Sequence, residues 1–550
     1  MQRMVRRKAL VRTMGSIESI GAITTIATDK TGTLTHNKLS VQELWHPRNQ
    51  RKYTLQTLAD AIVPHTRHSV ADPLDTAFRS FIAKNPPANV RKPVKVYQFE
   101  HALALSGALY HNGAQYVLAL KGAPEQMVER CDLAEGERER ATIELHHLTG
   151  LGFRVIALGH ATLKKPLKSL EALSPRQHIT FDGFVAIADT LRTEAKSAIA
   201  TAQAAGITVR MITGDHFETA YHIGRELGLV HHRSEVFDSR QMSMMSDDDL
   251  AERLKTIRVC ARVLPEYKHR ILEILKQRDI TAMTGDGVND IPALTNAHVG
   301  VAMGSGAQIA KDAGDIILLD NNFQSIVSAI HEGRTVYANI KRMVTYLLST
   351  NLGEVLVSLG SLIVGLPLPL TPVQILWINI VTDSAMVIPI GMEPGEARNM
   401  KQPPKPANAP LLSTFMISRI IIMALLMAVL VLTLYALFDH WHGADYARTV
   451  AFCALATVQW AGAFEARSDY ESLFRRIKKR NTPFLIGLFI AVGLQLIAIA
   501  SPFAPYLHVT PITATDCAIV TTVAFVLPII VLELHKWFGR TFLGKRPELN

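Results

Sequence analysis

Residues 26–35 read IATDKTGTLT, and this stretch decides the fold. The residues from Ile20 to Thr28 are apolar and β-branched, which predicts a short buried strand. Such a strand delivers the carboxylate of Asp29 to its C-terminal end, where open α/β sheets place their ligands. The stretch therefore predicts an α/β fold with a reactive or ligand-binding carboxylate at the edge of its sheet.

The composition around this stretch indicates a membrane protein of several domains. A chain of 550 residues is too long for one ordinary domain, and 48% of its residues are hydrophobic. The apolar residues concentrate after about residue 340, in repeated runs long enough to cross a bilayer. The net charge is +10, and basic segments such as RRIKKR (475–480) separate the apolar runs. This pattern predicts cytoplasmic loops and no nucleic-acid-binding surface.

The four cysteines lack CxxC spacing, so neither a zinc site nor a disulfide framework is indicated.

The order of predicted elements divides the chain into three domains. Strand–helix alternation after residue 179 predicts that residues 1–37 and 179–335 share one parallel α/β sheet. Residues 38–178 differ in character and read as an inserted domain with a helix near 72–85 and a hairpin turning at Asn112-Gly113. Residues 336–550 are predicted to form an all-α bundle of six spans. These spans cover about 343–366, 373–391, 415–438, 447–466, 483–500 and 518–537.

Three further polar loops follow predicted strands of the same sheet. They are TGD (213–215), TGDGVND (284–290) and IADTLR (187–192). A carboxylate beside Mg²⁺ can attack phosphorus, and Asp29 with Asp286 supplies the oxygen ligands that Mg²⁺ prefers. Lys268 and Thr213 are placed to hold phosphoryl oxygens. The sequence has no GxxxxGK[ST], which excludes a Walker-type phosphate loop.

DKTGTLT (29–35), KGAPE (121–125), TGD and TGDGVNDIPAL (284–294) in this order resemble the P-type cation-transporting ATPases. The resemblance implies a haloacid-dehalogenase-like phosphorylation domain, an inserted α+β nucleotide-binding domain and an aspartyl-phosphate on Asp29. The catalytic set that it implies is Asp29, Lys30, Thr31, Thr213, Gly214, Asp215, Lys268, Asp189 and Arg192. The Mg²⁺ ligands that it implies are Asp29, Thr31, Asp286 and Asp290, with Asn289 supporting the same loop. Thr190-Leu191 stand where the family usually has Pro-Pro.

The same resemblance implies an ATP site in the inserted domain. Phe99, Lys121, Gly122 and Arg154 match the nucleotide-contacting positions of the family. Adenine needs an aromatic face and the phosphates need cations, which these residue types supply. ATP and Mg²⁺ are therefore the expected cofactors.

Two predicted spans carry acidic residues where a charge is costly. Asn351 and Glu354 lie three apart in one span, and Asn379, Thr382 and Asp383 share a face of the next. A carboxylate at the centre of a span costs about 2.5–3.5 kcal/mol on insertion scales. The central turns contain no basic residue, so a bound cation is the expected partner.

At least five oxygen ligands with two negative charges suit Ca²⁺. The pattern also resembles the calcium pumps of the sarcoplasmic-reticulum type, with Na⁺/K⁺ or Mn²⁺ as alternative ions. Gln459 stands where the two-site calcium pumps have Glu, which favours one ion per cycle.

The resemblance also implies segments that are not found in this sequence. Pumps of this family carry four earlier spans and an actuator domain with a Thr-Gly-Glu loop, and no such tripeptide occurs here. We therefore expect the C-terminal part of a pump, unable to complete its cycle alone, with its soluble domains in the cytoplasm and its spans in the plasma membrane. A separate chain that carries the actuator domain and the first four helices would be its partner. The alternative is a non-transporting remnant, or a subunit that acts by binding a complementary half. Thr31 replaces the acid/base of related phosphatases, so a phosphoenzyme is expected to persist.

Overall fold

The computed structural model describes residues 2–13, 15–62, 72–89, 91–100, 102–173, 178–404, 410–500, 502 and 504–542. The chain divides into two compact units. The first comprises Met1–Ile330 with Met400–Pro404, and the second comprises His331–Asn399 with Lys405–Asn550.

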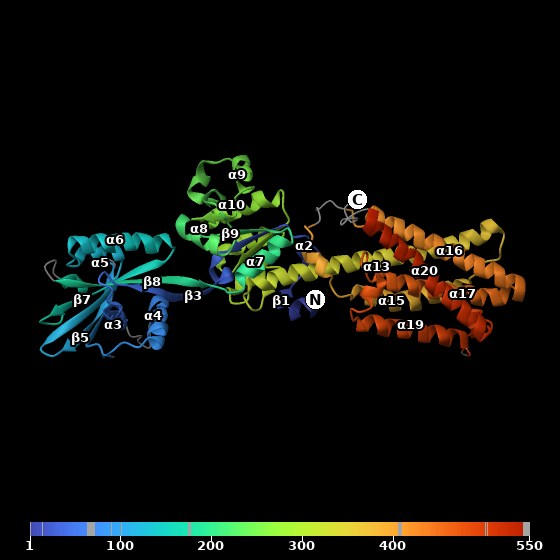
Figure 1. The fold of residues 1–550 in the computed structure, drawn as a ribbon, viewed down its shortest axis with the longest axis horizontal. Coiled ribbons are helices and arrows are strands. Elements are labelled where there is room, and N and C mark those ends of the chain that lie inside the picture. The colour runs from blue at the N-terminus through green and yellow to red at the C-terminus, as the bar shows by residue number, and fades with distance from the viewer. Residues whose placement is uncertain are drawn as a thin grey trace. The chain divides into compact units, whose positions relative to one another are not determined.

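The first unit contains an eight-stranded sheet in the order β1-β14-β13-β12-β2-β9-β11-β10 (Figure 1). Its strands are β1 Ala9–Val11, β2 Thr25–Asp29, β9 Thr208–Ile212, β10 Val236–Asp238, β11 Val259–Ala261, β12 Thr281–Gly285, β13 Val299–Met303 and β14 Ile316–Leu318. Neighbouring strands are parallel except for β1, which is antiparallel to β14. The associated helices are α1 Gln2–Arg6, α2 Gly15–Ala22, α7 Ala195–Ala204, α8 Phe217–Glu226, α9 Asp247–Leu254, α10 Pro265–Lys276, α11 Ile291–Asn296 and α12 Gln308–Ala313.

The central strand β2 positions Asp29. Its first four residues are fully buried between two apolar cores, because both faces of a parallel sheet are covered by helices. The predicted strand over 20–28 begins only at Thr25, and Ile20 lies in α2 with its side chain buried. An apolar run alone does not show where a helix ends and a strand begins.

A second sheet in the first unit has six antiparallel strands in the order β3-β8-β7-β6-β5-β4. They are β3 Thr35–Trp45, β4 Lys95–Glu100, β5 Leu105–Asn112, β6 Gln115–Gly122, β7 Arg154–Leu163 and β8 Ile179–Leu191. Helices α3 Arg51–Ala61 and α4 Pro73–Lys84 cover one face, and α5 Pro124–Arg130 and α6 Glu135–Gly150 cover the other (Figure 1). The predicted hairpin turn is confirmed, with Gly113 at φ 62° between β5 and β6.

Strand β8 differs from its prediction. The sequence places residues 181–189 in the parallel sheet, whereas β8 pairs with β3 and β7 in the antiparallel sheet. A buried apolar strand reads the same in either sheet, so only the tertiary pairing assigns it. The pairing returns Asp189 to the start of β3, directly after the DKTGTLT stretch.

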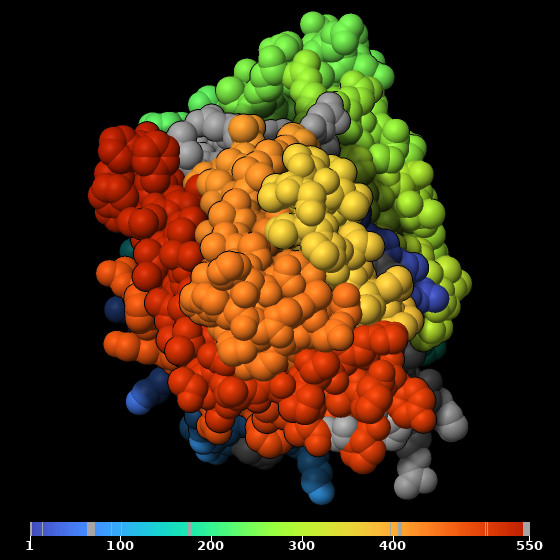
Figure 2. All heavy atoms as spheres, turned by 90° about the vertical axis from the view of Figure 1, so that its right-hand side faces the viewer, coloured from blue at the N-terminus to red at the C-terminus, as the bar shows by residue number. Residues whose placement is uncertain are grey.

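The second unit is helical. Its helices are α13 Phe323–Val364, which begins in the first unit, then α14 Pro372–Trp377, α15 Ser384–Gly391, α16 Thr414–His442, α17 Ala444–Ala466, α18 Leu473–Arg476, α19 Thr482–Ala500 and α20 Ala514–Phe542. Figure 2 looks onto the end of this unit, where the orange segments that include α16 and α17 lie beside the red segments that include α20.

Among the described residues, five helices are long and apolar enough to cross a membrane, one fewer than predicted. The predicted span 447–466 is helix α17, which falls outside this group of five. Nearly all of its residues are buried, including Gln459 and Glu465. A helix that packs against other helices on all sides does not need the apolar surface that lipid requires.

The span from Pro372 to Gly391 is interrupted by a π-helical turn, η6 Ile378–Asp383. Thr371 caps its start through a reciprocal hydrogen-bond pair with Gln374. Single π turns inside α-helices are frequent at functional sites, and this one carries Asn379, Thr382 and Asp383.

Candidate functional site

Asp29 lies at the C-terminal end of β2 and is bound by Lys268 from α10. The Lys268 ammonium donates to Asp29 Oδ2 at 2.5 Å and to Asp290 Oδ1 at 2.9 Å. Both aspartates were predicted from motifs that lie about 260 residues apart, and the parallel pairing of β2 with β12 brings them together. The geometry therefore places a cation directly against the predicted nucleophile.

The loop after β12 is organised by Asp290, whose side chain is buried. Asp290 Oδ2 accepts hydrogen bonds from the backbone N–H groups of Asp286 and Gly287 at 3.3 and 3.2 Å. Because Lys268 occupies its other oxygen, Asp290 is a loop-holding residue in this structure. Asn289, predicted on the same loop, is exposed.

Asp286 approaches the DKTGTLT stretch through a position that only glycine permits. Gly32 has φ +73°, and a Cβ there would lie 2.5 Å from Asp286 Oδ2. The adjoining residue Thr31 is half-buried and lies in the same irregular turn, η1 Lys30–Leu34. Asp29, Asp286 and the turn at Thr31 therefore form one acidic cluster.

Burial and the neighbouring charges shift the pKa values of the residues in this cluster. Burial raises the pKa of Asp29, and Lys268 opposes that shift. Burial, and then the negative charges of Asp29 and Asp290, raise the pKa of Asp286. Burial lowers the pKa of Lys268, but Asp29 and Asp290 outweigh this effect, so the net pKa is raised. The site thus favours a further cation near its carboxylates.

The TGD loop after β9 lies beside the same turn. Lys30 Nζ forms an ion pair with Asp215 Oδ2 at 2.8 Å, and the Asp215 N–H donates to Thr213 Oγ1 at 3.2 Å. Thr213 is buried and Gly214 is exposed. Lys30 therefore connects the turn of DKTGTLT to the TGD loop.

Asp189 and Arg192 bind the segment that follows the turn. Thr35 Oγ1 donates to Asp189 Oδ2 at 2.5 Å, the Lys38 N–H donates to Asp189 Oδ1 at 3.0 Å, and Arg192 Nε donates to the Thr35 carbonyl at 3.1 Å. The sequence missed Thr35, although it is the last residue of DKTGTLT. These contacts hold the exit of the turn and do not reach Asp29.

The predicted nucleotide residues lie on the antiparallel sheet. Phe99 on β4 is 53% exposed, and Arg154 at the start of β7 is also exposed. Lys121 on β6 is buried in an ion pair with Asp75 of α4, and its ammonium lies 5.6 Å from the centre of the Phe78 ring. A Cβ at Gly122 would meet the Ala104 carbonyl. Asp75 was not predicted, because nothing in its local pattern links it to a lysine on another element.

In the second unit, Glu354 of α13 is buried and accepts two amide hydrogen bonds. The donors are Asn379 Nδ2 and Gln459 Nε2, each at 2.9 Å. Gln459 Oε1 and Thr382 Oγ1 are buried without a hydrogen-bond partner among the described residues. Buried oxygens without partners are costly, and a bound cation would satisfy them.

Asp383 is also buried, and both of its oxygens accept hydrogen bonds from α13. Tyr346 OH donates to Oδ1 at 3.1 Å, and Thr350 Oγ1 donates to Oδ2 at 3.0 Å. The structure does not bring Asn351 into this cluster, because its exposed side chain donates to the Leu347 carbonyl. Asn351 is therefore the member of the predicted oxygen set that lies outside this cluster. The hydroxyl groups of Tyr346 and Thr350, which the sequence did not single out, bind Asp383 instead.

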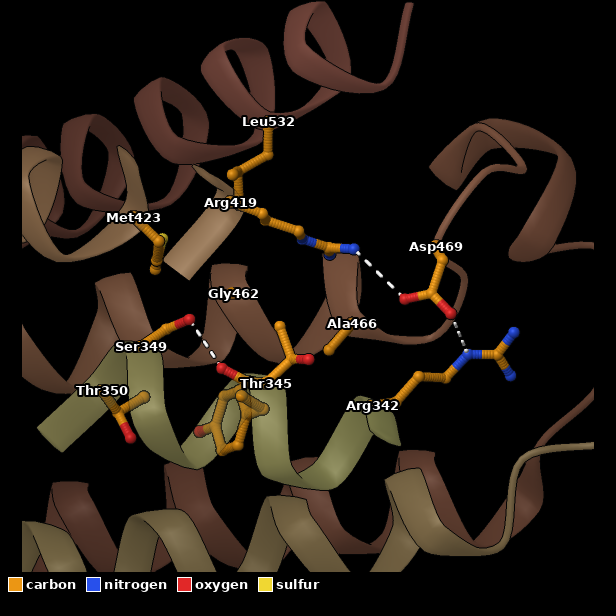
Figure 3. A pocket seen from close by; sticks show the side chains of 11 residues that line it. Arg342, Thr345, Ser349, Thr350, Arg419, Met423, Gly462, Ala466, Asp469 and Leu532 are labelled. Carbon is orange, nitrogen blue, oxygen red and sulfur yellow. Dashed lines mark hydrogen bonds and ion pairs between the residues drawn. The ribbon is translucent and has the colours of Figure 1, made fainter. Parts of the chain in front are cut away.

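A cavity of about 20 Å³, room for one water, lies beside Thr350 (Figure 3). Asp469 at one end is paired with Arg342 at 3.3 Å and with Arg419 at 3.7 Å. Thr345 lines the cavity, and its hydroxyl is buried without a partner among the described residues.

Three family models match the chain. The model described as haloacid dehalogenase-like hydrolase matches residues 23–298, and a second model of that description matches 270–330. The model described as cation transporting ATPase, C-terminus, matches residues 367–538.

Curated relatives agree with these matches. A protein of Mycobacterium tuberculosis named "Probable cation-transporting ATPase F" is 34% identical over 89% of this chain and 60% of its own length. A calcium-transporting ATPase of Bacillus subtilis is 31% identical over 94% of this chain and 64% of its own length. A calcium-transporting ATPase of Lactococcus lactis is 31% identical over 90% and 59%. The chain thus spans about three fifths of the length of these relatives.

Proposed function

The chain belongs to the haloacid dehalogenase-like hydrolase family and carries the C-terminal domain of the cation-transporting ATPases, and from that premise we propose that it uses ATP to drive cation transport through a phosphorylated Asp29. The observation that carries the proposal is the ion pair between Lys268 and Asp29 at 2.5 Å, at the end of the central strand. The curated relatives described above are named as cation-transporting or calcium-transporting ATPases, which supports the same activity here.

In the proposed reaction, an Asp29 carboxylate oxygen attacks the γ-phosphorus of ATP. The bond between that phosphorus and the bridging oxygen breaks, and ADP leaves with the electron pair. Lys268 neutralises charge at the reacting carboxylate, and Thr213 and Lys30 hold the adjoining loops in place. Thr31 supplies no carboxyl acid/base, so the acyl-phosphate is expected to persist.

Magnesium fits the acidic cluster of Asp29, Asp286 and the turn at Thr31. The missing Cβ of Gly32 makes room for the Asp286 carboxylate, which lies near the negative charges of Asp29 and Asp290. Among the described residues no group of three or more His, Cys, Asp and Glu side chains is arranged for a metal, but Mg²⁺ needs only one or two carboxylates beside phosphate oxygens and water. When bound, it would neutralise the phosphoryl oxygens.

The antiparallel sheet is proposed to bind ATP. The exposed ring of Phe99 can stack on adenine, and the exposed guanidinium of Arg154 can bind a phosphate. Lys121 is buried against Asp75, so we propose that it contacts the nucleotide only at its edge or after that ion pair opens.

Calcium is proposed as the transported ion. Glu354 and Asp383 supply the charge, and the oxygens of Asn379, Thr382 and Gln459 complete a partial cage. Such a hard, flexible oxygen set suits Ca²⁺ better than a soft metal. Na⁺/K⁺ and Mn²⁺ are the alternatives that a competition assay would separate.

A partner in the membrane and a location in the plasma membrane are part of the proposal. The exposed amide of Asn351, on a helix that can cross a membrane, supports a partner helix that brings further oxygen ligands. A separate chain of that kind would be recovered by co-purification with this protein from its own membranes.

Acid-stable labelling tests the proposed chemistry. The membrane-purified chain is incubated with γ-labelled ATP and Mg²⁺, with and without Ca²⁺, and label retained after acid is counted. We expect stable label in the wild type, stimulated by Ca²⁺, and none in Asp29→Asn. Asp312→Asn is the matched control, because Asp312 is an exposed carboxylate of the same unit.

The outcomes separate the parts of the proposal. Equal label in Asp29→Asn would refute the aspartyl-phosphate. Labelling that does not depend on Ca²⁺ but is stimulated by Mn²⁺ or Na⁺ would show that the transported ion is not Ca²⁺. No label in the wild type would favour the remnant that acts by binding alone.

A further inference from the structure

The two buried carboxylates of the proposed cation site, Glu354 and Asp383, are held by different elements. Glu354 receives its hydrogen bonds from Asn379 and Gln459, which lie on η6 and α17. Asp383 receives both of its hydrogen bonds from α13, through Tyr346 and Thr350. All four carboxylate oxygens therefore accept a hydrogen bond, and the hydroxyl donors concentrate on Asp383.

The spacing on α13 makes this arrangement possible. Tyr346, Thr350 and Glu354 follow one another at intervals of four residues, so they share one face of the helix. Tyr346 and Thr350 on this face bind Asp383, and Glu354 on the same face accepts a hydrogen bond from Gln459. One helix thus supplies a carboxylate and the supports of a second carboxylate.

The hydroxyl of Thr350 has a second acceptor within reach. Besides Asp383 Oδ2 at 3.0 Å, it lies 3.1 Å from the Leu347 carbonyl. One hydroxyl proton serves one acceptor fully at a time, so Thr350 can turn to Leu347 if a ligand takes the carboxylate oxygen. Tyr346 is buried in an apolar core, which fixes its ring beside Asp383.

Each carboxylate oxygen has more than one acceptor direction. A hydrogen bond from Tyr346 and a bound cation can therefore share Asp383. With both oxygens held from α13, the carboxylate is restrained in the rotamer seen here before any cation arrives. Ligands that are oriented in this way by neighbouring donors bind metals more tightly than free ones.

We propose that Tyr346 and Thr350 are positioning residues of the cation site, and that their hydroxyl groups hold Asp383 ready for the ion. The inference rests on the proposed function, because it names the supports of the same site. Neither residue belongs to the oxygen set predicted from the sequence.

The test measures ⁴⁵Ca²⁺ equilibrium binding to the purified full chain, together with the Ca²⁺ concentration that half-saturates phosphoenzyme formation. We expect Thr350→Val and Tyr346→Phe each to weaken Ca²⁺ binding about ten-fold, as loss of a ligand's support does elsewhere. The phosphoenzyme level at saturating Ca²⁺ should stay unchanged. Thr350→Ser restores the hydroxyl and should bind within about two-fold of the wild type, a difference small against the loss expected for Thr350→Val.

Two matched controls remove the same groups elsewhere. Thr433→Val deletes a hydroxyl on α16 that donates to the Val429 carbonyl at 2.7 Å, and Tyr435→Phe deletes a buried hydroxyl without a partner among the described residues. Both should bind Ca²⁺ as the wild type does.

The results distinguish the inference from the function on which it rests. Unchanged affinity in Thr350→Val and Tyr346→Phe, with normal binding in the wild type, would overturn the inference alone. An equal loss in Thr350→Ser would also overturn it, since the packing of the side chain and not its hydroxyl would then matter. Absence of Ca²⁺ binding in the wild type and in both controls would overturn the proposed ion and the inference together.

Discussion

At the scale of single residues, the site depends on charges brought together from distant motifs. Asp29 and Asp290 meet at the ammonium of Lys268, and Asp286 enters the space that Gly32 leaves open. The sequence identified Asp29 and the loop of Asp286 and Asp290 because each follows an apolar strand. It did not identify Thr35, because a hydrogen bond to a carboxylate 154 residues away has no local signature.

Gly32→Ala is predicted to abolish phosphorylation. The added Cβ would collide with Asp286 Oδ2, and the positive φ costs an L-residue about 1–2 kcal/mol. Acid-stable labelling measures the loss. Gly113→Ala is the matched control, since it shares a positive φ but has nothing within 4 Å of its Cβ position. Normal labelling in Gly32→Ala would show that Asp286 can move away without harm.

At the scale of elements, pairing and packing override local pattern. The apolar residues of β8 were compatible with the parallel sheet, but the strand pairs with β3 and β7. Helix α17 forms where a span was predicted over 447–466, and the burial of its polar residues Gln459 and Glu465 against other helices is not visible in its local pattern. In both cases the neighbouring elements, which a single segment does not reveal, decide the outcome.

The buried carboxylate of Asp182 on β8 connects this strand to strand β7 and to helix α3. Asp182 accepts from Thr57 of α3 at 2.9 Å and lies 2.7 Å from His160 Nδ1 of β7. The hydrogen bond to Asp182 raises the pKa of His160, and burial opposes that shift. The protonated imidazole is therefore favoured in the folded protein.

This linkage predicts a pH-dependent loss of stability in His160→Gln. The stabilisation is fully present below the ordinary pKa of histidine, about 6.5, and disappears as pH rises through the higher folded value. Thermal unfolding should show a larger deficit at pH 6 than at pH 9, up to about 1 kcal/mol after solvent screening. His111→Gln, which changes an exposed histidine near the end of β5, serves as the control. An equal deficit at both pH values would contradict the linkage.

At the scale of the whole molecule, the second unit combines an apolar bundle with a buried ionic layer. Glu393, which has no exposed surface, accepts from Arg467 at 3.1 Å and from Arg476 at 2.9 Å. Arg342 of α13 is paired with Glu396 at 2.5 Å. The Arg342–Glu396 pair ties the connection that follows α15 to α13, the helix that carries Glu354.

Glu393→Ala is predicted to destabilise the membrane unit by about 3–5 kcal/mol, because it leaves two buried arginines without their shared carboxylate. Thermal unfolding of the detergent-purified protein measures the effect. Glu252→Ala removes an exposed ion pair with Lys255 and should leave the unfolding temperature nearly unchanged. A similar small change in both variants would mean that the ionic layer contributes little.

The sequence alone determined the kinds of chemistry and the order of the elements that carry them. Motif order around Asp29, the apolar runs and the acidic residues within them are local properties, so the family, the α/β fold and most helices follow from the chain itself. The tertiary structure decided which side chains meet: Lys268 with Asp29, Thr350 with Asp383, and β8 with β3. Hydrogen bonds and ion pairs act over about 3 Å in space and are indifferent to distance along the chain. Only the folded chain assigns their partners.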